Sequence, residues 1–117
     1  MNKRNIGNEY EQIAVEYLTQ NGYEIVEQNF RNRMGEIDII AIDGDYLVFV
    51  EVNYRRTSGE GHPSEAVNYS KQRRITKTAM YYCGINGISE YRPMRFDVIS
   101  ILGEKIELFK NAFEAVM

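Results

Sequence analysis

The 117-residue sequence contains one cysteine, Cys83, and no tryptophan. A single cysteine can form neither an internal disulfide nor a thiolate metal cage, which indicates a reducing, cytoplasmic compartment. No apolar run approaches the roughly 18 residues that a membrane-spanning helix needs, so we expect no membrane partner. The first residues lack the apolar block of a secretory signal peptide. We therefore expect a cytoplasmic protein that forms a single domain over residues 1–117.

Acidic and basic side chains are separated along the chain, although the net charge is only −3. Residues 1–51 hold ten acidic and four basic side chains, whereas residues 52–95 hold eight basic and three acidic ones. The small negative total argues weakly against a nucleic-acid partner. However, an acidic first half followed by a basic segment could hold cations and a polyanion together.

Hydrophobic periodicity predicts a mixed α/β domain with the element order α-β-β-β-α-β-β. Asn8 followed by Glu11 is a capping-box pattern, which predicts a helix from residue 8 to about residue 21 and gives Glu11 a purely structural interpretation. The buried face of this helix is expected to carry Ile13, Ala14, Tyr17 and Leu18. The other expected elements are strands over 24–30, 36–42 and 46–52, a helix over 63–83, and strands over 95–102 and 105–109.

An Asp-Gly pair between two β-rich runs predicts a hairpin in the first half of the chain. If residues 43–44 form the centre of the turn, Glu36 lies opposite Glu51. If residues 44–45 form it, Asp38 lies opposite Glu51. Because side chains alternate along a strand, both registers place the three carboxylates on one face of the sheet.

These three carboxylates are unusual, because they lie in strands that otherwise resemble core. Like charges that face each other destabilise a sheet, so something must offset the repulsion. A divalent cation would do so, since Mg²⁺ is typically held by one or two carboxylates together with waters and phosphates. A solvated face on which Arg31 or Arg55 pairs with the acids would do so too. Both explanations stay open at this point.

Residues 35–40 (GEIDII) and 48–55 (VFVEVNYR) resemble the YraN family of uncharacterised, endonuclease-like bacterial proteins. The likeness covers nearly the whole chain and includes the basic segment 71–74 and the motif Arg-Phe-Asp-Val at 95–98. That family in turn is similar to the PD-(D/E)XK nuclease superfamily, which includes restriction enzymes and archaeal Holliday-junction resolvases. The resemblance implies a restriction-endonuclease-like mixed sheet flanked by helices.

The same resemblance implies a Mg²⁺- or Mn²⁺-dependent phosphodiester hydrolase. Asp38 and Glu51 would hold the metal ion, with Glu11 assisting from the first helix, and Gln72 would orient the metal-bound water or a phosphate. The metal would lower the pKa of bound water and neutralise charge that develops on the phosphate. The side chains expected to bind the nucleic-acid backbone, of DNA rather than RNA, are Arg55, Arg56, Lys71, Arg73, Arg74 and Lys77.

One position departs from the superfamily motif, because Asn53 stands where the motif has lysine. Asparagine can hydrogen-bond but carries no charge, and losing one such electrostatic group commonly costs about 10²–10³ in rate. Lys71, or failing that Arg55, would then supply the cation. Alternatively, the chain is a degenerate nuclease that binds nucleic acid without efficient cleavage.

A third interpretation is a small interaction domain whose acids are merely solvated. If the chain is a nuclease of this kind, a homodimer is also expected, because small nucleases often pair subunits to address two strands.

Overall fold

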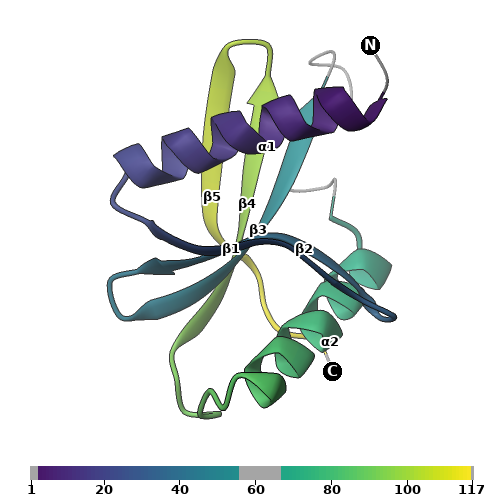
Figure 1. The fold of residues 1–117 in the computed structure, drawn as a ribbon, viewed down its shortest axis with the longest axis vertical. Helices are drawn as coiled ribbons and strands as arrows, with labels where there is room; N and C mark the ends of the chain where they lie inside the picture. Colours follow the sequence, from purple (N-terminus) through teal and green to yellow (C-terminus); the bar gives the residue numbers. More distant parts are fainter. Residues whose placement is uncertain (1–2, 56–66, 117) are drawn as a thin grey trace.

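The computed structural model describes residues 3–55 and 67–116, with side chains from residue 9 onward in the first range. Its elements, shown in Figure 1, are α1 (Lys3–Gln20), β1 (Glu24–Asn32), β2 (Gly35–Asp43), β3 (Tyr46–Arg55), α2 (Tyr69–Ile85), β4 (Met94–Leu102) and β5 (Lys105–Phe113). The predicted mixed α/β order is confirmed. Within these ranges, no helix has the length and apolar character that crossing a membrane requires.

The five strands form one sheet in the order β1-β2-β3-β4-β5. β3 and β4 run parallel, while the other neighbouring pairs are antiparallel. Parallel neighbours cannot be joined by a tight turn, and the connection that contains α2 makes this crossover. α1 and α2 lie on opposite sides of the sheet (Figure 1).

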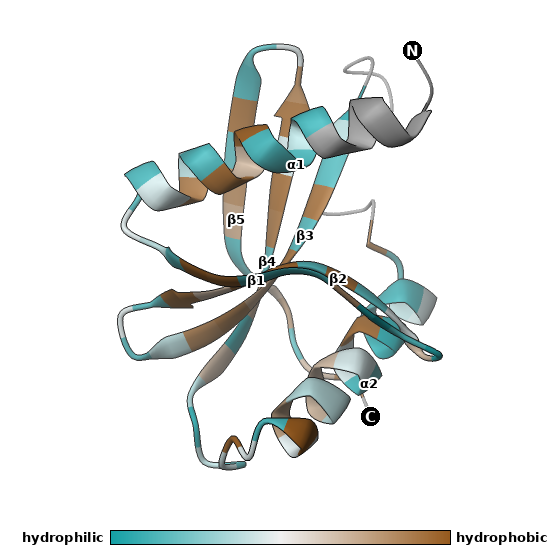
Figure 2. Cartoon of the chain, in the orientation of Figure 1, coloured by the Kyte–Doolittle hydropathy of each residue, from teal (hydrophilic) through white to brown (hydrophobic). Residues whose placement is uncertain are grey.

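Each helix covers its own hydrophobic core. The core on the α2 side includes Phe49, Ile75 and Val98. The core on the α1 side includes Val50, which follows Phe49 on β3, and Ile99, which follows Val98 on β4. This division follows from the alternation of side chains along β3 and β4. Figure 2 shows apolar residues along much of β4 and polar residues at the turn that leads into β5.

The start of α1 differs from the prediction. The helix begins at Lys3 and continues through Asn8, so Asn8 is not its N-cap and Glu11 is not part of a capping box. The predicted buried face is partly wrong as well. Ala14 and Leu18 are fully buried, whereas Ile13 is 37% exposed. The stripe that packs on the sheet instead includes Tyr10, Ala14 and Leu18, spaced four residues apart.

The start of α2 was also predicted too early. Residues 63–66 lie outside the described residues, whereas residues 67 and 68 are described and precede the helix, which begins at Tyr69. Asn68 is its N-cap: the backbone is extended there, with φ −71° and ψ 172°, and the side chain accepts a hydrogen bond of 2.9 Å from the Lys71 N–H. An Asn at this position satisfies an otherwise unpaired helix donor, and this sets where Lys71 lies.

The hairpin between β2 and β3 adopts the second of the two registers considered. Ile42 pairs with Leu47 and Ile40 with Phe49, so residues 44–45 form the centre of the turn. Gly44 has φ +61°, the left-handed backbone that a two-residue hairpin turn requires at its first central position. The last pair of this register is Ile39 with Val50, so Asp38 and Glu51 lie directly beyond it on the two strands.

Candidate functional site

A cavity of about 220 Å³ lies between the beginning of β2, the middle of β3 and the first turns of α2. We call it the acidic cavity, and the residues that line it are Gly35, Glu36, Asp38, Glu51, Lys71, Arg74 and Ile75. The three carboxylates that were expected to share one face thus line one cavity. Two of the basic residues expected to bind phosphate join them there.

Asp38 and Glu51 form the centre of the acidic cavity. Glu51 is only 9% exposed, and its side chain lies beside that of Asp38, so that each group affects the pKa of the other. Asp38 Oδ2 also accepts a hydrogen bond of 2.8 Å from the Val52 N–H. Burial and the charge of Glu51 raise the pKa of Asp38 well above its usual range. Burial likewise raises the pKa of Glu51, although Lys71 opposes this effect.

Lys71 brings a positive charge to this pair. Its Nζ lies 2.6 Å from Glu51 Oε1, and 41% of the lysine side chain remains exposed. Because Asn68 caps the helix, Lys71 lies in the first turn of α2, above β3. Lys71 was the first choice to replace the missing motif lysine, and its ammonium group does lie at the predicted acidic pair.

Gly35 allows β2 to approach α2 closely. A side chain at this position would place its Cβ 3.1 Å from Thr78 Oγ1 and 3.6 Å from Arg74 Cβ. The first of these contacts is tighter than ordinary packing, so glycine fits this crossing best. The close approach brings Glu36 and Asp38 beside the basic side of α2.

Several predicted site residues lie elsewhere. Asn53 is partly exposed on β3 and does not line the acidic cavity. Gln72 does not line it either: its side-chain amide donates a 2.8 Å hydrogen bond to the Val67 carbonyl and so fastens the start of α2. The expected orienting role of Gln72 therefore has no support in this geometry.

The remaining basic residues are divided between two elements. Arg55 is buried at the end of β3, whereas Arg73 and Lys77 are exposed on α2. Arg56 lies outside the described residues. Among the members of the expected basic set that the structure describes, only Lys71 and Arg74 line the acidic cavity.

Glu11 is close to this site but not part of it. Its side chain hydrogen-bonds to Asn29, and burial together with the charge of Glu36 raises its pKa. Its Oε1 is buried without a hydrogen-bond partner in the described part of the chain. Of the charges that raise the pKa of Asp38, that of Glu11 contributes least. Glu11 also does not line the acidic cavity. The expected third ligand is therefore not brought to the pair.

The donor chemistry of Asp38 and Glu51 fits a hard divalent cation. Across residues 3–55 and 67–116, no group of three or more His, Cys, Asp or Glu side chains is arranged as a metal site. Mg²⁺ does not require one, because it is commonly bound by one or two carboxylates plus waters and substrate phosphates. A cation held by both carboxylates would offset the repulsion between them.

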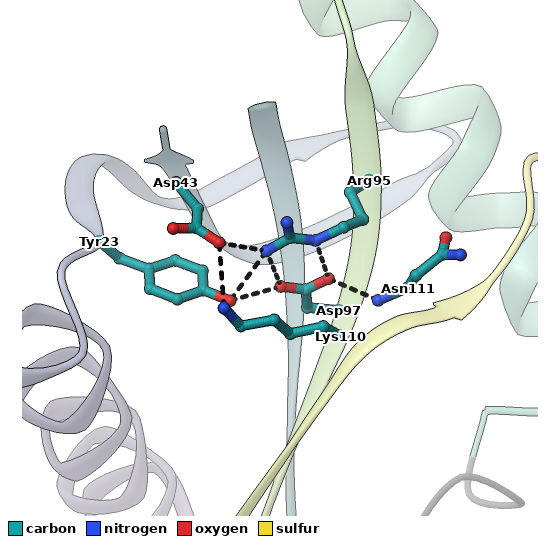
Figure 3. Close-up of polar contacts among 6 residues, drawn as sticks. All are labelled: Tyr23, Asp43, Arg95, Asp97, Lys110 and Asn111. Carbon is teal, nitrogen blue, oxygen red and sulfur yellow. Dashed lines mark hydrogen bonds and ion pairs between the residues drawn. The ribbon is translucent and has the colours of Figure 1, made fainter. Parts of the chain in front are cut away.

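Sequence reasoning missed a second buried carboxylate cluster, drawn in Figure 3. Asp97 is fully buried. Its two oxygens accept hydrogen bonds from Arg95 at 2.8 and 2.9 Å, from the Tyr23 hydroxyl at 2.8 Å and from the Asn111 N–H at 2.9 Å. We call this the Asp97 network. Its sequence signal was an acidic residue within the apolar strand over 94–102, the same signal that drew attention to Asp38.

The Asp97 network extends to the end of β2. Arg95 also donates to Asp43 Oδ2 at 2.8 Å, and Lys110 lies 3.3 Å from the same oxygen (Figure 3). Hydrogen bonding to Arg95 and Lys110 holds the pKa of Asp43 below its usual range. These contacts join β2, β4 and β5, and the polar groups of the network serve as hydrogen-bond partners for one another. The network therefore has a structural role.

Comparisons with known proteins give family relationships without an activity. Residues 10–101 match the model of the "Uncharacterised protein family UPF0102". A UPF0102 protein of Lachnoclostridium phytofermentans is 51% identical over 115 residues, which cover 98% of each chain. Another, of Thermodesulfovibrio yellowstonii, is 47% identical over 108 residues, 92% of this chain and 95% of the relative. The names of these relatives specify no role for the acidic cavity.

Proposed function

The chain belongs to the uncharacterised protein family UPF0102, and we propose that it is a nucleic-acid-binding, endonuclease-like member whose acidic cavity is the active site. The YraN resemblance named this same family and is confirmed. The relation to PD-(D/E)XK nucleases is part of the proposal. The proposed reaction is Mg²⁺-dependent hydrolysis of a phosphodiester bond in DNA.

The single observation that supports this proposal is the contact of Lys71 with the buried Asp38–Glu51 pair. Burial raises the pKa of both carboxyl groups, and at Asp38 the charge of Glu51 raises it further. Such groups in a cavity are typical of functional sites. The pair also has a cation beside it and an arginine on the cavity wall, which are the charges that a phosphate group needs.

Each side chain then has a specific role. Asp38 and Glu51 would hold the metal ion, which when bound supplies an activated water and neutralises phosphate charge. The Lys71 ammonium would bind a non-bridging phosphate oxygen and stabilise the negative charge that develops on it. The Arg74 guanidinium would position the same or the next phosphate through paired hydrogen bonds.

A second candidate function is favoured by Asn53. This residue leaves the motif without its lysine, and a chain of this kind could bind nucleic acid while cleaving it poorly. The two candidates differ in what Lys71 does: in the first it replaces the motif lysine, and in the second it only neutralises Glu51.

Cleavage of labelled linear and branched DNA in Mg²⁺ or Mn²⁺ tests the proposal. Lys71→Met should lower the cleavage rate about 10²- to 10³-fold, because one electrostatic group is lost. Asp38→Asn should abolish cleavage. The matched controls are Lys105→Met and Asp45→Asn, which change exposed side chains outside the acidic cavity and should cleave like wild type.

The variant Asn53→Lys separates the two candidate functions. If the wild type cleaves, Asn53→Lys should partly rescue Lys71→Met, because it supplies a lysine on the same strand face as Glu51. If the wild type binds DNA without cleaving it and Asn53→Lys cleaves, the second candidate is correct. Absence of any DNA binding would show both to be wrong.

A further inference from the structure

Beside the acidic cavity, α2 and the turn between β1 and β2 leave large apolar side chains at the surface. Met34 is 36% exposed, and Met80 and Tyr81 are each 47% exposed. With Lys77 they line a hollow of about 390 Å³. A second hollow of about 300 Å³ shares Met34 and Tyr81 with the first and is also lined by Asn32 and Arg33. We call the two hollows together the Tyr81 surface.

We propose that the Tyr81 surface binds an unpaired nucleobase of the same nucleic acid whose backbone enters the acidic cavity. The substrate would then carry a single-stranded segment beside the bond that is cleaved. This inference rests on the proposed function and specifies its substrate class.

The side chains of the Tyr81 surface suit a flat aromatic ligand. The Tyr81 ring is held by contact with Phe30, with ring centroids 6.4 Å apart, yet nearly half of the residue stays accessible. Met34 and Met80 add flexible, polarisable side chains that pack well against aromatic rings. Stacking of a base on an exposed aromatic ring tolerates any sequence, because every base has a π-face.

The charges around the Tyr81 surface favour a polyanion over an apolar protein segment. The charged side chains that line its two hollows are Lys77 and Arg33, and both are basic. No acidic side chain lines either hollow among the residues that the structure describes. A base in the hollow would therefore have cations close by for its flanking phosphates.

The Tyr81 surface continues from the acidic cavity along one helix. Arg74 lines the cavity, Lys77 follows it by one turn, and Tyr81 follows Lys77 by another. At 1.5 Å per residue, Tyr81 lies roughly 10 Å beyond Arg74 along the helix axis, which is about three stacked nucleotides at ~3.4 Å each. A strand following α2 would thus reach Tyr81 shortly after leaving the cavity. Within a duplex the base faces are stacked on one another, so only an unpaired base can use this ring.

Binding of fluorescent oligonucleotides tests the inference. In an Asp38→Asn background, which prevents cleavage, fluorescence anisotropy gives the Kd for a short single strand and for the corresponding blunt duplex. Tyr81→Ala should raise the single-strand Kd about tenfold, as expected for loss of one stacked base, and leave the duplex Kd unchanged. Tyr81→Phe should bind like the parent. The control Tyr91→Ala changes a tyrosine that is 86% exposed and lines neither hollow, so it should have no effect.

A base analogue distinguishes stacking from an indirect effect on the fold. The fluorescence of 2-aminopurine, placed in turn at each position of the single strand, should be quenched at one position by the parent protein and not by Tyr81→Ala. Equal affinities of the parent and Tyr81→Ala, or equal losses for single strand and duplex, would overturn the inference while the proposed function stands. If the parent binds neither oligonucleotide, the proposed function fails with it.

Discussion

Two buried carboxylate clusters lie at neighbouring positions of the central sheet but on opposite faces. Asp97 pairs with Val50, whose side chain belongs to the α1-side core, and Glu51 is the next residue along β3. The Asp97 oxygens accept from a guanidinium, a hydroxyl and a backbone N–H. Asp38 and Glu51 have one backbone N–H, one lysine and each other.

The difference between these clusters indicates a structural role for the Asp97 network and a functional role for the acidic cavity. A carboxylate offers about four lone-pair sites, and the Asp97 network fills those of its acid with groups from the chain itself. A fully satisfied polar network of this kind rigidifies a fold. Within residues 3–55 and 67–116, the acidic cavity leaves acceptor sites unused and keeps two acids together, which suits a group that arrives from outside. The four predictions that follow test this contrast.

The largest expected effect is the loss of the Asp97 network. Arg95→Met should lower the free energy of unfolding by about 3–5 kcal/mol, because Asp97 is left buried without its countercharge. Urea denaturation measures this change. The matched control Arg73→Met alters an exposed arginine on α2 and should stay within about 0.5 kcal/mol of wild type. A loss of less than about 1 kcal/mol in Arg95→Met would contradict the structural role of the network.

Metal binding should give the next largest effect. A ligand that binds only the folded state stabilises it by about 2.7 kcal/mol when the free concentration is about a hundred times its Kd. Mn²⁺ or Mg²⁺ should therefore raise the Tm of the wild type and of Asp45→Asn, and leave that of Asp38→Asn unchanged. An equal rise in all three proteins would place the metal somewhere other than the acidic cavity.

Removing one of the paired acids should stabilise the metal-free protein. In EDTA, Asp38→Asn should raise the free energy of unfolding by about 0.5–2 kcal/mol, the gain that single stabilising substitutions commonly give. The new amide can accept from the Val52 N–H and donate to Glu51, and it removes the repulsion between two acidic groups. The same change at Asp97 should destabilise the protein, and similar losses from both substitutions would contradict the contrast between the clusters.

The smallest expected effect is a pH dependence at the edge of the Asp97 network. Arg95 and Lys110 lower the pKa of Asp43, so the unfolded chain takes up the Asp43 proton at higher pH than the folded protein does. The stability that Asp43 contributes is therefore present above the unfolded pKa of about 3.9 and is lost as the pH falls through the folded pKa. Wild type should exceed Asp43→Asn in stability near neutral pH, and this difference should shrink in acid. A difference that stays constant with pH would contradict this assignment, and Asp45→Asn serves as the exposed control.

Much of the fold could be predicted from local signals. Apolar runs at strand spacing and the turn at Gly44 gave the strands and the hairpin, because both depend on neighbouring residues. The start of α1 could not be predicted, because a plausible cap at Asn8 did not stop the helix from continuing to Lys3. Ile13 was misplaced because the packed stripe is rotated toward Tyr10.

The acidic side chains of the site were predicted from the sequence, whereas its basic side chains were predicted only in part. Acidic residues within apolar strands indicated Asp38 and Glu51, and the hairpin register brings them together. The place of Lys71 depends on the cap at Asn68, whereas the sequence pattern predicted that this helix begins at residue 63. Asp97 had the same acidic signal. Its partner Arg95 lies two residues before it on β4, but the Tyr23 hydroxyl and the Asn111 N–H are brought to it only by the assembled sheet. The sequence around Asp97 therefore shows one of its partners and not the other two.

Diffraction from a crystal soaked in Mn²⁺ tests the central claim most directly. The account predicts an anomalous peak within about 2.0–2.3 Å of carboxylate oxygens of both Asp38 and Glu51, as for a hard divalent cation bound by oxygen ligands. A crystal in which the manganese is bound elsewhere, or is not bound at all, would contradict it.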